Sequence, residues 1–514
     1  MQKFLLVTLA ATGIAQSAAF AADFAKPNII YILADDLGYG DVQCLNPKRG
    51  KIKTPNLDKL AGQGMTFTDA HATASVCTPS RYAILTGRYN WRSWVPYGVL
   101  SPYGSAMIPP TRTTVATMLR QQGYATACIG KWHIGWDWSN QGKPMSFKEP
   151  WEAATLKYRP MDFSKPIKGG PTAVGFDYFF GMDAPNFPPY CFIENDRTVG
   201  VPAAPWKAPK TNNSYRYPAT PGMGLPDWRM EDILPGITAK SCDFITDQAK
   251  AKTPFFLYFA LTSPHTPLAV NKEWEGKSGL DLYADFVMET DAMVGRVLDA
   301  LEKNGVADNT LVIFSSDNGC AQYCVPELEK KGHFPSARFR GYKADAWDGG
   351  HRVPFLVRWP AVVKPGSTCG QLACQMDLMA TAAEITGTKI PATAGEDSVS
   401  LLPLLKGEDR PVRETLIHHS IEGKFAIREG NWKLLVCPGS GGWSKPVDAD
   451  AKKRKLPAVQ LYDMSADAGE QKNLQAEQPD IVARLTAKLE QIVADGRSTP
   501  GPKQKNDVPV KILK

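Results

Sequence analysis

The sequence predicts an α/β fold in which one large, mostly parallel sheet lies between layers of helices. A smaller C-terminal antiparallel sheet with a packed helix follows it. Two observations predict the large sheet: short apolar runs alternate with stretches of helical periodicity, and no internal repeat interrupts them. The composition is that of a globular protein, because 43% of the 514 residues are hydrophobic and 22% are charged. A disordered chain, a collagen and a coiled coil are therefore excluded.

Each element of the large sheet follows from a local pattern. Apolar runs predict strands at 28–33, 125–129, 255–260, 311–314 and 353–357. Helical periodicity predicts helices at 56–63, 80–85, 114–121 and 284–304. Residues 182–235 are rich in proline, aromatic residues and asparagine and show no period. We expect them to form long ordered loops that build a site.

A second region begins near residues 395–410. Strands are predicted at 425–428, 433–436 and 459–462, the first two around the turn Glu429-Gly430-Asn431, and an amphipathic helix at 480–493. We expect the polar, proline-containing tail from Arg497 to be extended or loose. Together these patterns predict a large domain over residues 22–400 and a C-terminal subdomain over residues 401–514.

The first 21 residues have the pattern of a cleaved signal peptide. Lys3 supplies a positive charge, residues 4–15 are apolar, and Ala19-Phe20-Ala21 fits a small-x-small cleavage site. A membrane anchor is the alternative, but the apolar run is shorter than the ~20 residues that a span requires. We therefore expect an exported protein, periplasmic or secreted, without a membrane span.

Charge and cysteine content limit the partners. Lys and Arg total 59 against 52 acidic residues, and this formal charge of +7 is spread along the chain, so no nucleic-acid partner is expected. Ten cysteines in an exported chain could pair, and Cys320 with Cys324 and Cys369 with Cys374 are close in sequence. Spacing alone assigns no pairs. Nothing in the sequence indicates an oligomeric state.

Polar side chains follow the predicted strands at the points where the strands end. In open parallel sheets, ligands bind beyond the carboxyl ends of the strands, so these residues are candidates for a common site. They are Asp35 and Asp36 after 28–33, Lys131 and His133 after 125–129, His265 after 255–260, and Asp317 and Asn318 after 311–314; Lys343 precedes 353–357.

Two polar pairs in this set have the ligand chemistry of a metal site. Asp35, Asp36, Asp317 and Asn318 all offer oxygen atoms, which suit Ca²⁺ or Mg²⁺ rather than zinc. Capping of a strand-to-helix turn is the alternative for either pair alone. Because two such pairs follow two strands, the sequence favours a metal.

Cys77 is predicted to lie at the start of a helix. Pro79 is a good first helical residue, and residues 80–85 continue the helix. The free N–H groups and the dipole of a helix N-terminus attract anions, so Cys77 is a candidate nucleophile towards an anionic substrate. A half-buried thiol at a helix cap is the alternative.

Several segments together resemble one enzyme family along nearly the whole chain. The segments are Cys77-Thr78-Pro79-Ser80-Arg81 with Leu85-Thr86-Gly87-Arg88, residues 28–40, Gly130-Lys131-Trp132-His133-Ile134-Gly135, Ser263-Pro264-His265-Thr266-Pro267, Ser316-Asp317-Asn318-Gly319, Lys343 with Asp348-Gly349-Gly350-His351-Arg352-Val353-Pro354, and Leu461-Tyr462-Asp463 with Glu470-Gln471-Lys472-Asn473-Leu474. They resemble the type I, formylglycine-dependent sulfatases of the alkaline phosphatase superfamily. Asp348 stands where that family usually has glutamate.

The resemblance implies an alkaline-phosphatase-like fold and a set of roles. A separate maturase would oxidise Cys77 to formylglycine, whose hydrated aldehyde attacks the sulfur of a sulfate ester. One Ca²⁺ would be held by Asp35, Asp36, Asp317 and Asn318 and by the group at position 77. Further roles are implied for Arg81 (orienting the diol), Asp317 (taking the diol proton), Lys131 and Lys343 (binding sulfate oxygens), His265 (protonating the leaving oxygen) and His133 (base for release of the sulfate).

The substrate is predicted from a narrower resemblance. Residues 86–100 and 130–138 resemble bacterial carbohydrate sulfatases that act on 6-O-sulfated galactose or N-acetylgalactosamine, in host or algal glycans. Tryptophans near the motifs suit the faces of sugar rings, with core packing as the alternative, and for Trp132 we expect core packing; a loop offers rim contacts. These residues are Trp91, Trp94, Trp132, Trp136 and Trp138, and Asp196 and Arg197.

Other functions remain open at the level of sequence. A sulfatase for another sulfate position, a phosphatase of the same superfamily and a non-catalytic glycan-binding protein are the alternatives. A phosphatase of that superfamily usually has a Ser or Thr nucleophile and a histidine-rich two-zinc site, whereas this chain has seven histidines and Cys77. We expect the five histidines without an implied role to be structural or rim residues; they are His71, His333, His351, His418 and His419.

Overall fold

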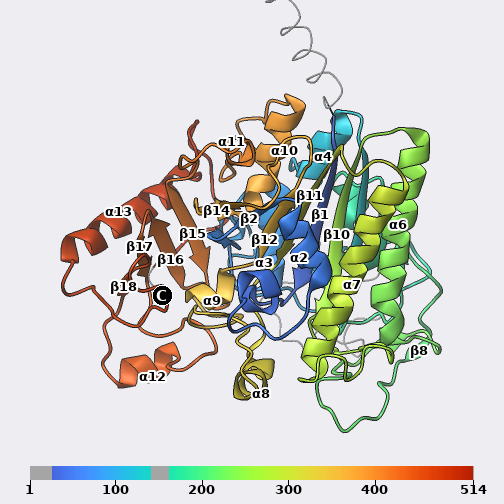
Figure 1. Cartoon of the computed structure of the whole chain (residues 1–514), viewed down its shortest axis with the longest axis horizontal. Coiled ribbons are helices and arrows are strands. Elements are labelled where there is room, and N and C mark those ends of the chain that lie inside the picture. Colours follow the sequence, from blue (N-terminus) through green and yellow to red (C-terminus); the bar gives the residue numbers. More distant parts are fainter. Residues whose placement is uncertain (1–25, 140–160, 513–514) are drawn as a thin grey trace, which may run out of the picture.

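The computed structural model describes residues 26–139 and 161–512, so the predicted signal peptide lies outside the described residues. Its main feature is a ten-stranded sheet in the order β13-β2-β12-β11-β1-β10-β4-β5-β6-β7 (Figure 1). The strands are β1 (Asn28–Asp35), β2 (Met65–Phe67), β4 (Ala125–Lys131), β5 (Tyr178–Met182), β6 (Ile193–Glu194), β7 (Arg197–Thr198), β10 (Phe255–Pro264), β11 (Thr310–Ser316), β12 (Phe355–Arg358) and β13 (Ser367–Cys369).

The five central strands β11, β1, β10, β4 and β5 are parallel, which confirms the predicted fold class. β1 and β10 are buried along their whole length. Strands that are covered on both faces need apolar side chains on both, and this explains why they are continuous apolar runs rather than alternating patterns.

Helices cover the two faces of the sheet. On one face, Ile30 and Ile32 of β1 share a hydrophobic core with α2 (Pro55–Gly62), α6 (Ile233–Ala251) and α7 (Leu282–Lys303). On the other face, Tyr31 and Leu33 share a core with α3 (Cys77–Thr86), α4 (Val115–Gln121) and α10 (Leu378–Thr386). Alternate side chains of a strand point to opposite faces, so one strand serves both layers.

The remaining elements are short. They are the strand pairs β3 (Ala70–His71) with β14 (Ala373–Cys374) and β8 (Ala204–Pro205) with β9 (Met223–Gly224), and the helices α5 (Gly170–Ala173), α8 (Val325–Lys330), α9 (Asp348–His351), α11 (Leu402–Leu405) and α12 (Asp448–Lys453). Among residues 26–139 and 161–512, none of the helices combines the length and the apolar character needed to cross a bilayer. All ten cysteines are free, including the two close pairs.

The C-terminal region forms a four-stranded antiparallel sheet, as expected. Its strands are β15 (Thr415–His419), β16 (Phe425–Glu429), β17 (Trp432–Leu435) and β18 (Gln460–Asp463), and α13 (Pro479–Asp495) packs on it. The sequence did not predict β15. This sheet stands beside the large one (Figure 1).

The end of the chain is extended, one of the two forms expected, and hydrogen bonds hold it in place. Asp507 accepts two hydrogen bonds from the Arg88 guanidinium at 3.1 and 3.2 Å, and its backbone N–H donates to the Arg92 carbonyl. Asn506 accepts a further bond from Arg92 at 3.0 Å. The tail is therefore attached to the segment that follows α3. Its composition did not predict this, because its charged partners are distant in sequence.

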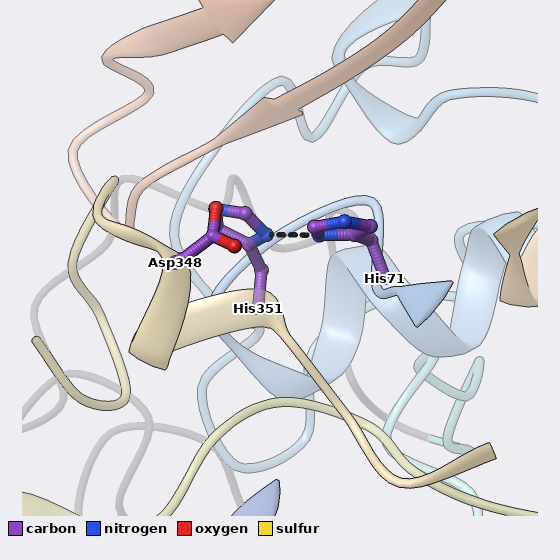
Figure 2. Close-up of side chains that lie close together, drawn as sticks. All are labelled: His71, Asp348 and His351. Atoms are coloured by element: carbon purple, nitrogen blue, oxygen red, sulfur yellow. Dashed lines mark hydrogen bonds and ion pairs between the residues drawn. The ribbon is translucent and has the colours of Figure 1, made fainter. Parts of the chain in front are cut away.

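A buried charged cluster joins the two sheets (Figure 2). Asp348 of α9 accepts hydrogen bonds from the Lys433 ammonium of β17 at 2.8 Å and from Arg352 at 2.6 and 3.0 Å. Lys433 also lies 2.8 Å from a carboxylate oxygen of Glu470. Burial raises the pKa of Glu470 to about 7, despite the neighbouring ammonium. We refer to this group, with His71, His351 and His418, as the inter-sheet cluster.

Two histidines continue the inter-sheet cluster as a chain of hydrogen bonds. His351 Nε2 lies 3.2 Å from the Lys433 ammonium, which can only donate, so the proton of His351 is on Nδ1. That Nδ1–H donates to His71 Nδ1 at 3.0 Å, and His71 Nε2–H donates to Asp69 at 2.8 Å. Both rings are neutral in this arrangement. Burial lowers the pKa of His71 to about 4 and that of His351 further.

The inter-sheet cluster has the ligand types of a metal centre but is filled by lysine. Ligand atoms of His71, Asp348 and His351 lie within 4.8 Å of one another. The Lys433 ammonium already binds Asp348 and His351, so the cation of this site is part of the chain. All five histidines without an implied role are buried, which makes them structural rather than rim residues.

We predict that His418→Phe reduces the acid sensitivity of the fold. The His418 ring stacks on His351 with 3.6 Å between centroids, and within the described residues neither ring nitrogen has a hydrogen-bond partner. Burial holds the pKa of His418 well below its ordinary value. As the pH falls below about 6.5, the unfolded chain therefore binds a proton that the folded chain does not, and stability decreases by up to ~1.4 kcal/mol per pH unit for each such histidine.

The measurement is the free energy of unfolding between pH 7 and pH 5. At pH 7 the variant should be as stable as the wild type or about 1 kcal/mol more stable, because an unpaired polar ring becomes apolar. Its stability should decrease less on acidification. His333→Phe is the control, since His333 binds Asp41 at 2.8 Å and its loss should destabilise the fold at every pH. An unchanged pH dependence in His418→Phe would contradict the prediction.

Candidate active site

The two predicted polar pairs meet at the carboxyl ends of neighbouring strands. β1 and β11 are paired in parallel up to Ala34 and Ser316, so the residues that follow lie side by side. The Asp36 N–H donates to a carboxylate oxygen of Asp317 at 3.2 Å, and the Asn318 amide donates to Asp36 at 2.8 Å. Asp36 has a φ of 65°, a left-handed conformation that turns the chain at the strand end. All four side chains are buried.

Two lysines and a histidine contact these carboxylates. The Lys131 ammonium, at the end of β4, donates to Asp35 at 2.8 Å. The Lys343 ammonium lies 2.7 Å from Asp36, and His265 Nε2, just after β10, lies 3.7 Å from the same carboxylate. Burial alone would raise the pKa of Asp35, but Lys131, His265 and Arg81 hold it at about 2. Asp35 and Asp36 are therefore ionised.

Lys343 reaches this edge because β12 is antiparallel to β11. The chain enters β12 at the edge where its neighbours end, so a residue that precedes β12 lies beside residues that follow β1 and β11. The Lys343 N–H donates to the Cys320 carbonyl at 2.9 Å, and the next residue, Ala344, donates to the Ser75 carbonyl at 2.7 Å. The second of these bonds joins the segment that carries Lys343 to the segment that precedes Cys77.

Cys77 is the first residue of α3 and faces His133. Its sulfur lies 3.2 Å from His133 Nδ1, while His133 Nε2 lies 3.0 Å from the Leu100 carbonyl. A carbonyl only accepts, so Nε2 carries the proton and the lone pair of Nδ1 points at position 77. Burial and the Lys131 charge lower the pKa of His133 to about 4, which keeps the ring neutral and able to accept a proton. Burial raises the pKa of the Cys77 thiol.

Arg81 lies one helical turn after Cys77 and joins α3 to the sheet edge. Its Nε and one terminal nitrogen donate to the same oxygen of Asp317 at 3.0 and 2.8 Å, and the other terminal nitrogen donates to the Lys131 carbonyl at 3.1 Å. Arg81 also lies 3.7 Å from Asp35. The Arg81 guanidinium thus fixes α3, the end of β4 and the residue that follows β11 relative to one another.

Two buried oxygens at the centre have no hydrogen-bond partner within the described residues. They are Oδ1 of Asp35 and Oδ1 of Asn318. Leaving a buried polar atom unpaired costs about 1–3 kcal/mol, so two such atoms at one point indicate a ligand that both can bind. A carboxylate oxygen and an amide oxygen are ligands that hard divalent cations prefer, and Asp36 and Asp317 lie beside them. The residues present therefore fit a Ca²⁺ or Mg²⁺ ion.

Several residues expected to contact a sugar do not lie at this site. Trp91, Trp132, Trp136 and Trp138 are buried in hydrophobic cores, and Trp94 is partly buried, so core packing is their role. Asp196 and Arg197 belong to the β6–β7 hairpin, where Asn195 binds the backbone of Phe179. Phe179 precedes the active-site end of β5 by three residues, or roughly 10 Å, so this hairpin turns away from the site.

Asp183 is at the site and was missed by the sequence analysis. It follows β5, whose last residue Met182 is paired with Lys131. The side chain is buried, and burial raises its pKa although His133 and Lys131 lie near it. The ring of Phe187, from the same loop, meets the His133 ring edge-on at 5.2 Å. The run Tyr178–Met182 was a detectable apolar signal, and the next polar residue would have been found by the rule that identified the others.

Comparison with known proteins identifies the family of this arrangement. The family model named Sulfatase matches residues 27–388. An N-acetylgalactosamine-6-O-sulfatase of Bacteroides thetaiotaomicron is 34% identical over 91% of this chain and 93% of that protein. Bovine arylsulfatase A is 33% identical over 89% of this chain and 85% of that protein.

Solved structures share the fold. A Bacteroides thetaiotaomicron sulfatase from work on the metabolism of glycosaminoglycans superposes with a TM-score of 0.78 and 32% identity, covering 91% of this chain and 99% of that chain. The crystal structure of Ps i-CgsB in complex with k-i-k-neocarrahexaose has a TM-score of 0.68 and 25% identity, covering 93% of this chain and 95% of that chain. The architecture is therefore the alkaline-phosphatase-like fold of sulfatases.

We predict that a hard divalent cation stabilises the folded protein through the two unpaired oxygens. Adding Ca²⁺ or Mg²⁺ to chelator-treated protein should raise Tm, since a ligand that binds only the folded state at a hundred times its Kd contributes about 2.7 kcal/mol. Asp35→Asn should abolish this increase, and Asp299→Asn, at an exposed position of α7, should retain it. An equal cation response in Asp35→Asn and the wild type, by scanning calorimetry, would refute the assignment.

Proposed function

The chain belongs to the sulfatase family and is a sulfuric ester hydrolase; from this premise we propose that it removes 6-O-sulfate from galactose or N-acetylgalactosamine in sulfated glycans. The observation that carries the reaction is the convergence of Cys77, His133, Arg81, Lys131 and Lys343 on the carboxyl edge of the sheet. The proposed sugar is supported by the 34% identity to the Bacteroides N-acetylgalactosamine-6-O-sulfatase.

We propose that Cys77 acts as formylglycine after oxidation by a separate maturase. The environment supports this, because burial raises the pKa of the thiol and so disfavours a thiolate nucleophile. A hydrated aldehyde at this position supplies a hydroxyl for attack on sulfur. His133 Nδ1, 3.2 Å from the Cys77 sulfur, is placed to hold and return the proton of that hydroxyl.

The remaining side chains bind and orient the sulfate ester. The Lys131 and Lys343 ammoniums flank the centre and would neutralise the oxygens of a sulfate, which otherwise repels a nucleophile. Arg81 fixes the group at position 77 through its position on α3. His265 is the most exposed of these residues, with 13% of its side chain accessible, and so faces the leaving sugar oxygen.

His265 is proposed to donate the proton that the leaving oxygen takes. Burial and the Lys343 charge lower the pKa of His265. An anionic sulfate beside the ring would oppose this effect and favour the protonated imidazole, because an opposite charge stabilises the charged form.

We propose that one Ca²⁺ is held by Asp35, Asp36, Asp317 and Asn318, with the group at position 77 as a further ligand. The unpaired oxygens of Asp35 and Asn318 support this. A bound Ca²⁺ would supply positive charge for the sulfate oxygens.

The proposed 6-O position fits the depth of the site. A sulfate on the primary C6 carbon can enter a buried pocket while the sugar ring stays near the rim. Groups at the rim would then read the axial O4, since a buried polar group left unpaired by the wrong epimer lowers transition-state stabilisation. A sulfatase specific for another sulfate position is the second candidate.

The organisation of the chain is part of the proposal. Residues 1–21 would be removed as a signal peptide on export to the periplasm or beyond, residues 22–400 would form the catalytic domain, and residues 401–514 the C-terminal subdomain. The maturase and the sulfated glycan are the partners that this mechanism requires.

We predict that Cys77→Ala abolishes turnover without loss of the fold. The substitution removes the sulfur that the maturase must displace when Cβ becomes an aldehyde, and alanine suits a helix start with little strain. Hydrolysis of an aryl sulfate and of 6-sulfated N-acetylgalactosamine should both disappear, while Tm changes little. The mass spectrum of the wild-type peptide containing residue 77 should show an aldehyde instead of a thiol. Turnover retained in Cys77→Ala would exclude the mechanism.

We predict a preference for 6-sulfated galacto sugars in a substrate panel. kcat/KM should be highest for 6-sulfated galactose or N-acetylgalactosamine, and lower for 6-sulfated N-acetylglucosamine and for 3- and 4-sulfated galacto sugars. A site that hydrogen-bonds a hydroxyl can reject an analogue lacking it by several orders of magnitude. Preference for the gluco epimer, or for a sulfate on a ring carbon, would overturn the assigned specificity but not the sulfatase activity.

A further inference from the structure

An open groove of about 410 Å³ lies outside the catalytic centre. Its lining combines Phe334, residues 337–342 and Trp347 of the large domain with Ser444, Lys445, Gly469 and Gln471 of the C-terminal region. Arg49 and Glu329 complete it. The groove therefore lies between the two sheets, on the same segment that carries Lys343.

The groove is strongly cationic. Its charged lining residues are Arg49, Arg338, Arg340 and Lys445 against the single carboxylate of Glu329, so four positive charges face one negative charge. Within the described residues, none of the four cations forms an ion pair. Cations without carboxylate partners at one place attract a polyanion, because the attraction between unlike charges is not already satisfied inside the protein.

Two of the guanidiniums are held in fixed orientations. Arg49 lies over the Phe334 ring, 3.4 Å from its centroid, and donates to the Ala337 carbonyl at 3.3 Å. Arg340 lies over the Trp347 ring at 3.7 Å and donates to the Glu470 carbonyl at 2.7 Å. A stacked guanidinium retains free N–H donors for a sulfate or carboxylate and loses less conformational freedom on binding it.

The groove is connected to the catalytic centre through short loops. Gly341 and Tyr342 line the groove and directly precede Lys343. The backbone N–H groups of Trp443 and Ser444 both donate to Asp345, at 2.9 and 3.0 Å. Trp443 is 48% exposed, in contrast to the buried tryptophans near the motifs. Its indole, next in sequence to the groove residue Ser444, offers an exposed apolar face to a sugar ring.

We propose that this groove binds the part of a sulfated glycan chain that extends beyond the sugar whose ester is hydrolysed. The ligand class is a polyanionic oligosaccharide with several sulfates or carboxylates. This inference rests on the proposed function, because it assumes that the reacting sugar belongs to a chain. A neutral glycan would leave the four cations unsatisfied, and the even distribution of charge over the rest of the chain does not favour a nucleic acid.

The first test compares chain and monosaccharide substrates in an Arg338→Ala/Lys445→Ala double variant. Both side chains are exposed and outside the catalytic centre. On a sulfated galactosaminoglycan octasaccharide that ends in a 6-sulfated sugar, kcat/KM should decrease about tenfold, the scale expected for two exposed charge contacts. On the 6-sulfated monosaccharide it should remain within about twofold of wild type. Lys406→Ala, at an exposed lysine near α11, is the matched control and should change neither value.

The second test measures binding without turnover and separates the groove from the assigned specificity. Cys77→Ala protein should bind the octasaccharide more tightly than does the same protein carrying Arg338→Ala and Lys445→Ala, and the difference should shrink at high salt. If the substrate panel shows another sulfate position, this measurement still reports on the groove. Equal losses on chain and monosaccharide, no loss on the chain, or equal binding of a desulfated chain or of single-stranded nucleic acid would overturn the proposal.

Discussion

The hydrogen bonds from Arg81 to Asp317 are the interaction on which the catalytic edge depends. Burying three carboxylates within a few ångströms would be prohibitive without compensating charge, since each buried ion costs several kcal/mol. Arg81, Lys131 and Lys343 supply that charge to Asp317, Asp35 and Asp36. Because Arg81 lies on the helix that begins with Cys77, the contact that neutralises the aspartates also sets the distance of position 77 from them.

The parallel strands and the polar residues at their ends were predictable, because both are encoded locally. Residues 29–34 are apolar on both faces of the sheet, and Asp35 and Asp36 follow them directly. The direction of β12 was not predictable, since four buried residues look the same in either direction and only their pairing with Val312–Ser315 settles it. The exposure of each tryptophan likewise depends on which distant segment covers it, so Trp91 was placed wrongly and Trp443 was overlooked.

The inter-sheet cluster shows a related limit of sequence analysis. His71 and His351 are 280 residues apart, and their neighbours in sequence give no indication that they meet. A histidine–aspartate–histidine set of this kind has the ligand chemistry of a metal centre until Lys433 is placed within it. A lysine at this position has a structural advantage over a metal, because the two sheets then associate without depending on the supply of an ion. The groove proposed above also lies between the two sheets, so its width depends on how the sheets associate.

The attachment of residues 505–507 to the segment after α3 has a consequence for the order of events during synthesis. Arg88 emerges from the ribosome early, whereas Asp507, its partner, is 419 residues further along the chain. Contacts of such long range form late in folding. The helix that carries Cys77 therefore lacks part of its native support until nearly the whole chain has been translated. The maturase proposed above would therefore have time to reach Cys77 before folding leaves its side chain only 3% exposed.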